Sequence, residues 1–200
     1  MKYHTHPTVL LVYTLIFLNL SCGENHVAEA HRKQMEAAAA DTILSASEKA
    51  AIEANKLKNE AMDLVMASKP DQAAVVLKKA IELDPTQHNL YYQRGLALID
   101  AGKPQEAYND LTKAIQLNPR HANTLKARGH ASLNMGNYDN AIDDLNLALE
   151  ITPRDAQAYV HRARARFGKG QRNSGCSDLK KADYLRTVNV DDLLKEHCGE

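Results

Sequence analysis

The sequence predicts an all-α protein, an α-solenoid in which antiparallel helix pairs stack along the chain. A pattern of small and large apolar residues recurs every 34 residues. Gly and Pro stand where the paired helices would end and begin. The helix formers Ala, Leu, Lys and Glu are abundant while Trp is absent, which favours helices over strands. The apolar share of 44% is that of an ordinary folded chain, so a packed core is expected.

The period is visible at five positions of the repeat. They hold a small residue, a second small residue, a leucine, an alanine and a proline. The members of each position, 34 residues apart, are Gly95, Gly129 and Ala163; Ala107, Ala141 and Gly175; Leu111, Leu145 and Leu179; Ala114, Ala148 and Ala182; and Pro85, Pro119 and Pro153. A small residue lets the paired helices approach, and the leucine fills the space beside it. Since no single pair buries its apolar face, neighbouring pairs must complete the core.

This spacing resembles the tetratricopeptide repeat (TPR), whose signature has the same period and the same order of residues. The resemblance covers residues 54–189 and divides them into four units. The units are 54–87, 88–121, 122–155 and 156–189. It implies a right-handed solenoid with an inner groove lined by the first helix of each unit. It also implies binding of a protein or peptide rather than catalysis.

Each unit is expected to contain two helices. In the second unit they should cover 89–101 and 104–117, because Gly102 ends one helix and a proline is tolerated in the first turn of the next. In the first unit Ser68 replaces the turn glycine.

The last unit departs most from the pattern. Arg166 stands where the family favours Tyr, Gly175 replaces the helix-packing Ala, and Thr187 replaces Pro. Its second helix is therefore the least regular element expected. Residues 190–200 carry Leu193 and Leu194 beside charged residues, which predicts a short capping helix over the open end of the array.

The first residues, 1–21, are predicted to be a lipoprotein signal peptide. The apolar stretch 9–18 is too short to span a bilayer, which needs about 20 apolar residues. It leads to Leu-Ser-Cys at Cys22, which resembles the lipobox of bacterial lipoproteins, although Asn19 stands where that motif favours Leu. We therefore expect acyl chains such as palmitate on Cys22, holding the protein to a membrane of the cell envelope on its periplasmic side or at the cell surface. An ordinary secretory signal with an incidental cysteine is the alternative.

Residues 22–53 are rich in Ala, Glu and Lys and have no sustained apolar heptads. They are expected to form a helical tether with little packing, which spaces the array from the membrane. A coiled-coil dimerisation segment is the alternative interpretation.

The cysteine count fits an exported protein. The chain has three cysteines, and lipid attachment to Cys22 would leave Cys176 and Cys198. We predict a disulfide between these two, tying the second helix of the last unit to the capping helix, as an oxidising compartment permits. Two free, small apolar side chains are the alternative.

Charged residues also recur with the period. An Arg precedes the first small residue and an Asp precedes the helix-packing leucine in three units, whereas the first unit has Glu60 and Val76 at these places. This co-occurrence predicts structural ion pairs within each unit rather than unrelated solvated charges. The pairs are Arg94 with Asp110, Arg128 with Asp144 and Arg162 with Asp178.

The resemblance assigns a partner-binding groove to particular positions of each first helix. They carry apolar, amide and basic side chains, a mixture that suits an extended peptide or a helix. The residues are Lys58, Met62, Tyr92, Leu96, Asn123, Lys126, His130, Arg164 and Phe167. The dicarboxylate clamp of chaperone-binding members is not expected, because Met62, Gln93 and Ala127 interrupt it.

Other chemistry has weak support in the sequence. The 25 basic and 25 acidic side chains balance, which argues against nucleic acid as a partner. His130 and His161 could face each other on adjacent helices, but no carboxylate is placed to complete a metal site. The basic cluster of Arg162, Arg164, Arg166, Lys169 and Arg172 is interpreted as a solvated face rather than a site for an acidic partner or lipid. No catalytic constellation, cofactor motif or small-molecule site is apparent.

The sequence therefore predicts a non-enzymatic, membrane-anchored interaction scaffold. Two alternatives remain open. An assembly factor for outer-membrane proteins or pili rests on analogy of fold alone. A periplasmic glycan-binding module belongs to a different class of function.

Overall fold

The computed structural model describes residues 29, 31–35 and 45–199. The chain forms two units, Met1–Ser45 and Ala46–Glu200. In the first unit, residues 29 and 31–35 are helical, with an exposed ion pair between Lys33 and Glu29. The signal peptide and Cys22 lie outside the described residues.

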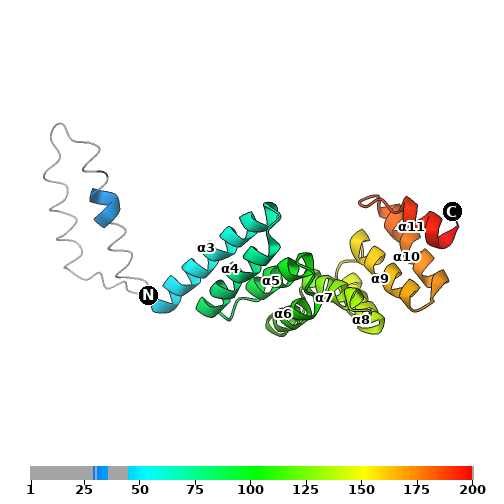
Figure 1. The fold of residues 1–200 in the computed structure, drawn as a ribbon, viewed down its shortest axis with the longest axis horizontal. Helices are drawn as coiled ribbons and strands as arrows, with labels where there is room; N and C mark the ends of the chain where they lie inside the picture. The colour runs from blue at the N-terminus through cyan, green and yellow to red at the C-terminus, as the bar shows by residue number, and fades with distance from the viewer. Residues whose placement is uncertain (1–28, 30, 36–44, 200) are drawn as a thin grey trace, which may run out of the picture. The chain divides into compact units, whose positions relative to one another are not determined.

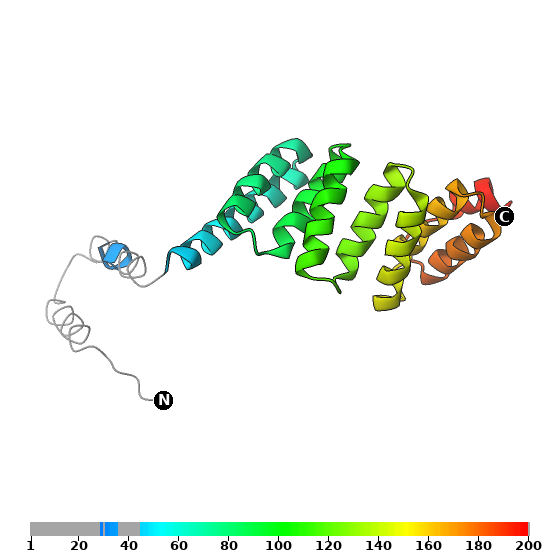
Figure 2. The same ribbon diagram turned by 90° about the horizontal axis from the view of Figure 1, so that it is seen from below.

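The second unit is a row of antiparallel helix pairs, each packed against the next (Figure 1). Seen from below, the pairs follow one another along the row in chain order (Figure 2). The helices are α3 (Ala46–Met66), α4 (Pro70–Leu83), α5 (His88–Asp100), α6 (Pro104–Leu117), α7 (Ala122–Asn134), α8 (Tyr138–Ile151), α9 (Ala156–Gly168), α10 (Arg172–Leu185) and α11 (Asp191–Cys198). The all-α solenoid expected from the period is thus the observed fold.

The first helix of the array is longer than expected. Helix α3 begins at Ala46, so residues 46–53 belong to the array and not to a separate tether. The reason is that these residues, Ala-Ser-Glu-Lys-Ala-Ala-Ile-Glu, are mostly good helix formers and continue the helix that Ala54 anchors in the core. Lys49, Lys56 and Asp63 are exposed, which gives this end of the array a charged outer side.

Close packing within each pair depends on glycine. A Cβ added to Gly95 would lie 2.7 Å from Cγ of Leu111, and one added to Gly129 would lie 2.9 Å from Cγ of Leu145. Both leucines are fully buried. The recurring glycine therefore makes room for the recurring leucine, and a side chain at that position would push the two helices apart.

The turns between paired helices require a left-handed backbone. Gly102, Gly136 and Gly170 have positive φ angles there, and Ser68 has φ 58° at the corresponding turn of the first pair. A non-glycine residue in this conformation stores about 1 kcal/mol of strain. The first turn of the array is therefore its most strained.

The last pair keeps its helices despite its irregular sequence. Helix α10 forms over Arg172–Leu185, and Gly175 leaves the space that the ring of Phe167 occupies. Helix α11 then covers the end of the array, with Val190 at its start only 2% exposed and Leu193 and Leu194 packed into the same cluster. Gly175 is thus an adaptation to Phe167 and not a defect of the repeat.

A disulfide fixes this cap. It joins Cys176 of α10 to Cys198 at the end of α11, with the Cα atoms 5.8 Å apart and 22 residues between them in sequence. This is the pairing that the cysteine count predicted. Among the helices of the described part of the chain, none is long and apolar enough to cross a bilayer.

Candidate functional site

One side of the array is formed by the first helix of each pair. Helix α5 approaches α3 and α7, and α7 approaches α9, whereas α4, α6, α8 and α10 approach only first helices and, for α10, the cap. Because the first helices crowd together, they form the inner side of the curve. The inner surface is defined here by three positions per helix: Asn55, Lys58 and Met62; Asn89, Tyr92 and Leu96; Asn123, Lys126 and His130; and Gln157, Val160 and Arg164.

The inner surface is apolar over the first two pairs. The side chain of Met62 is 45% exposed, and Val65 and Met66 beside it on α3 are exposed as well. Tyr92 and Leu96 on α5 are half-buried and pack on the core beneath them. This region offers contact area for apolar side chains of another molecule, with the exposed amide of Asn89 at its edge.

Two histidines that sequence reasoning overlooked hold Tyr92 in place. The ring centroid of His121 lies 5.3 Å from that of Tyr92 in an edge-on contact and 5.1 Å from that of His88. Nδ1 of His121 lies 2.6 Å from the Thr124 hydroxyl, and the Asn118 amide nitrogen lies 3.0 Å from Nε2 of His88. Burial raises the pKa of Tyr92 and lowers that of His121. Both histidines precede or open a first helix, so the repeat frame itself was the signal.

Lys126 has an internal partner. Its Nζ lies 2.6 Å from the Asp155 carboxylate, which also accepts a hydrogen bond from the Ala158 N–H at the start of α9. Lys126 therefore links the third pair to the fourth. It is a connecting residue more than a free contact for a partner.

His130 and His161 stack, with ring centroids 4.3 Å apart. The Gln157 amide nitrogen lies 3.2 Å from Nε2 of His161, while Nδ1 of His161 is buried without a partner. Burial, followed by the neighbouring His130 and Arg164, lowers the pKa of His161 to about 3. Burial and the charge of Arg164 also lower the pKa of His130, against a raising effect of Asp100. Both rings are therefore uncharged near neutral pH.

The predicted groove residue Phe167 does not belong to the inner surface. Its ring stacks on His197 of α11 at a centroid distance of 4.3 Å and fills the space above Gly175. The sequence prediction was wrong at this residue because the last first helix has no following pair. The cap covers the place where a groove side chain would be exposed.

The three predicted ion pairs have the expected partners. Each Asp accepts two hydrogen bonds from the Arg of its own pair, over 2.6 Å for Arg94 and Asp110, 2.7 to 2.8 Å for Arg128 and Asp144, and 2.7 to 2.9 Å for Arg162 and Asp178. The hydrogen bond from Asp144 raises the pKa of Arg128.

These arginines also reach the preceding pair. Arg128 donates to the Thr112 hydroxyl at 3.3 Å and Arg162 to the Asn146 amide oxygen at 2.7 Å. Sequence reasoning missed this second contact. It indicates that the pairs fix the register between repeats as well as between the two helices of a repeat.

The basic cluster of the last pair is mostly neutralised. Arg162 and Arg166 share Asp178, which is 3% exposed, and Lys169 pairs with Asp139. Arg172 donates to the backbone carbonyl of His197 at 2.6 Å. Arg164 is exposed and has no hydrogen-bond or ion-pair partner among the residues that the structure describes.

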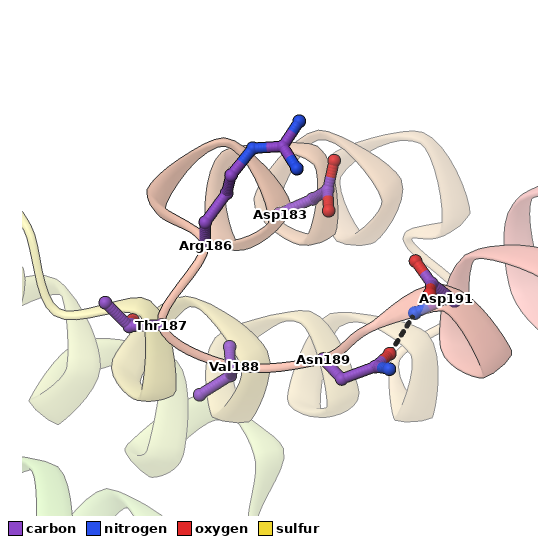
Figure 3. A pocket seen from close by; sticks show the side chains of 6 residues that line it. All are labelled: Asp183, Arg186, Thr187, Val188, Asn189 and Asp191. Atoms are coloured by element: carbon purple, nitrogen blue, oxygen red, sulfur yellow. Dashed lines mark hydrogen bonds between the residues drawn. The ribbon is translucent and has the colours of Figure 1, made fainter.

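Two cavities lie at the cap and not on the inner surface. The larger, about 360 Å³, is lined by the loop between α10 and α11 (Figure 3), where the Asn189 side chain accepts a hydrogen bond from the Asp191 N–H at 3.0 Å. The other, about 320 Å³, lies beside Phe167 and His197. Within residues 29, 31–35 and 45–199, no three His, Cys, Asp or Glu residues gather as metal ligands.

Tetratricopeptide-repeat family models match residues 76–109 and 98–170. The chain is a tetratricopeptide-repeat protein. TPR domains are typically interaction modules rather than catalysts, and their extended concave surface is the part that binds. No curated protein matches the sequence.

Solved structures of TPR proteins have the same fold. A structure of MamA is 30% identical, covering 66% of this chain and 77% of its own, with a TM-score of 0.61. MamA from Desulfovibrio magneticus RS-1 is 26% identical, with coverages of 68% and 77% and a TM-score of 0.63. The pilF protein of Pseudomonas aeruginosa, 18% identical, covers 78% of this chain and 72% of its own with a TM-score of 0.65, a likeness of fold alone.

Proposed function

We propose that this TPR protein is an envelope scaffold that holds a segment of a partner protein on its inner surface. The observation that carries the proposal is the exposed apolar area around Met62, Tyr92 and Leu96, bordered by amide side chains. Apolar anchors supply binding energy, and amides satisfy the backbone groups of a bound segment. The role requires no chemical reaction.

A structure of similar fold supports peptide binding in general terms. The first TPR of Spaghetti (RPAP3), 22% identical, was solved with the HSP90 peptide SRMEEVD bound. This chain lacks the paired basic and amide positions of a dicarboxylate clamp, with Met62, Gln93 and Ala127 at the critical places. The partner segment proposed here is therefore not a chaperone tail.

The membrane anchor is part of the proposal and rests on the sequence. The apolar stretch 9–18 and the Leu-Ser-Cys at Cys22 support lipid attachment to that cysteine. Cys22→Ser should move the protein from the membrane fraction to the soluble fraction. Mass spectrometry of the mature N-terminus should find acyl chains on wild type, and unmodified protein retained in the membrane would contradict the anchor.

The binding surface is tested by a matched pair of substitutions. Met62→Glu places a charge on the inner surface, whereas Val75→Glu makes the same change at the 60% exposed Val75 on α4. Neither side chain is needed by the core, so both variants should fold. Chemical crosslinking in cells, followed by purification and mass spectrometry, should recover a protein partner from wild type and Val75→Glu. Met62→Glu should lose it, and equal recovery from both variants would exclude the inner surface as the binding site.

A further inference from the structure

The inner surface changes character along the array. Its first half is apolar, while its second half presents two uncharged histidine rings and the guanidinium of Arg164. The other basic side chains around Arg164 have internal partners: Lys126 has Asp155, and Arg162 and Arg166 have Asp178. Arg164 is therefore a cation placed on the binding surface with no anion of its own.

His130 lies beside this cation at the same position of the preceding repeat. Its ring stacks on His161, and its nitrogens make no hydrogen bond to another described residue. The charged or titratable groups around it are His161 and Arg164 on α9 and Asp100 at the end of α5. His161 is only 6% exposed, so His130 is the ring of the pair that a partner can reach.

We propose that Arg164 and His130 together bind a carboxylate of the partner segment, and that His130 takes up a proton from solvent when this carboxylate binds. The inference rests on the proposed function and specifies its partner: a segment with an acidic residue over the last two repeats and apolar residues over the first two. Charge complementarity at Arg164 and the apolar area at Met62 fix that polarity.

The coupling follows from simple electrostatics. In the free protein the charge of Arg164 and the burial of the ring both oppose protonation of His130. A carboxylate bound between them would neutralise the repulsion from Arg164 and attract the proton directly. By linkage, a ligand that raises the pKa of a group binds more tightly as the pH falls toward that pKa. Carboxylates themselves remain ionised in this range.

The free protein provides a test that needs no partner. In the Arg164→Gln variant the pKa of His130, measured from its ring proton signals by NMR, should rise, because the repulsive charge is gone. Lys58→Gln, at the far end of the inner surface, removes an equal charge and should leave His130 unchanged. An unchanged pKa in Arg164→Gln would mean that the two groups do not interact, and would overturn the proposal.

The second test uses a labelled synthetic peptide with the segment Leu-Val-Leu-Ser-Glu-Glu, prepared in both chain directions, and its Gln-Gln counterpart. Fluorescence anisotropy should find tighter binding of a Glu-Glu peptide, with affinity about three- to tenfold higher near pH 6.5 than near pH 7.5. Arg164→Gln should weaken binding at both pH values. His130→Asn should keep binding but abolish its pH dependence.

The outcomes separate this inference from the proposed function. Equal, pH-independent binding of the Glu-Glu and Gln-Gln peptides would leave the inner surface as a peptide-binding site and overturn the carboxylate site. Binding of neither peptide would also overturn it, while loss of the cellular partner in Met62→Glu would still uphold the scaffold role. A pH dependence that persists in His130→Asn would overturn the assignment of the proton to that ring.

Discussion

The two ends of the array are closed in different ways. The first pair, α3 and α4, has Val76 where the other pairs have a buried Asp, and its turn holds Ser68 in a left-handed conformation. The last pair has an Asp shared by two arginines, a covering helix and a disulfide. In a solenoid each repeat is stabilised by its neighbours, so an end repeat lacks half of this support. The comparison indicates that added cross-links stabilise the C-terminal end, while a long charged helix closes the N-terminal end.

The largest effect is expected from the disulfide. Replacing Cys176 and Cys198 together by Ser should lower the free energy of unfolding of the last pair by about 3 kcal/mol, the entropy of closing a loop of this length. Hydrogen exchange should accelerate in α10 and α11 and stay unchanged in α3 and α4. Uniform acceleration along the array would mean that the cap stabilises the whole row.

Acid should also act on the C-terminal half. The pKa of His161 is about 3 in the folded protein, against about 6.5 in an unfolded chain, so the unfolded state binds the proton first as the pH falls. His161 therefore costs no stability above about pH 6.5 and destabilises the fold progressively from there toward about pH 3, by about 2 kcal/mol at about pH 5. Urea unfolding across this range should reveal the slope. His161→Leu should flatten it.

The ion pairs allow an internal comparison of the third and fourth repeats. Arg128→Met leaves Asp144 buried without a cation, and should cost about 2 kcal/mol. Arg162→Met should cost about half as much, because Arg166 still donates to Asp178. Urea unfolding of both variants measures the difference. An equal loss would mean that Arg166 does not substitute for Arg162.

The smallest effect should come from the first turn, and it should be a gain. Ser68→Gly relieves the left-handed strain at φ 58° and should raise stability by about 0.5 kcal/mol, after the added flexibility of the unfolded chain is subtracted. Hydrogen exchange should slow in α3 and α4. Gly102→Ser, which introduces the same strain into the second pair, is the matched control and should lower stability there.

The repeat frame made most of the fold predictable from sequence. Gly95 and Leu111, and their counterparts 34 residues on, identified the helix pairs, and the co-occurrence of Arg and Asp identified the ion pairs. Residue positions that obey the period could be transferred from one unit to the next. Prediction was wrong where the period ends: α3 extends back to Ala46, and Phe167 is covered by the cap. An end repeat has no neighbour on one side, so the pattern does not say what replaces it.

The sequence by itself determined the helix pairs, the ion-pair partners and the disulfide, because each follows from residues at fixed positions in a repeating frame. Only the tertiary structure decided which charges remain available to a partner. Five basic residues cluster in the last repeat, yet their partners come from α8, α10 and the cap, far apart in the chain, and leave Arg164 exposed beside His130. Neutralisation of a charge depends on distances across the stack, and those are set by packing between repeats.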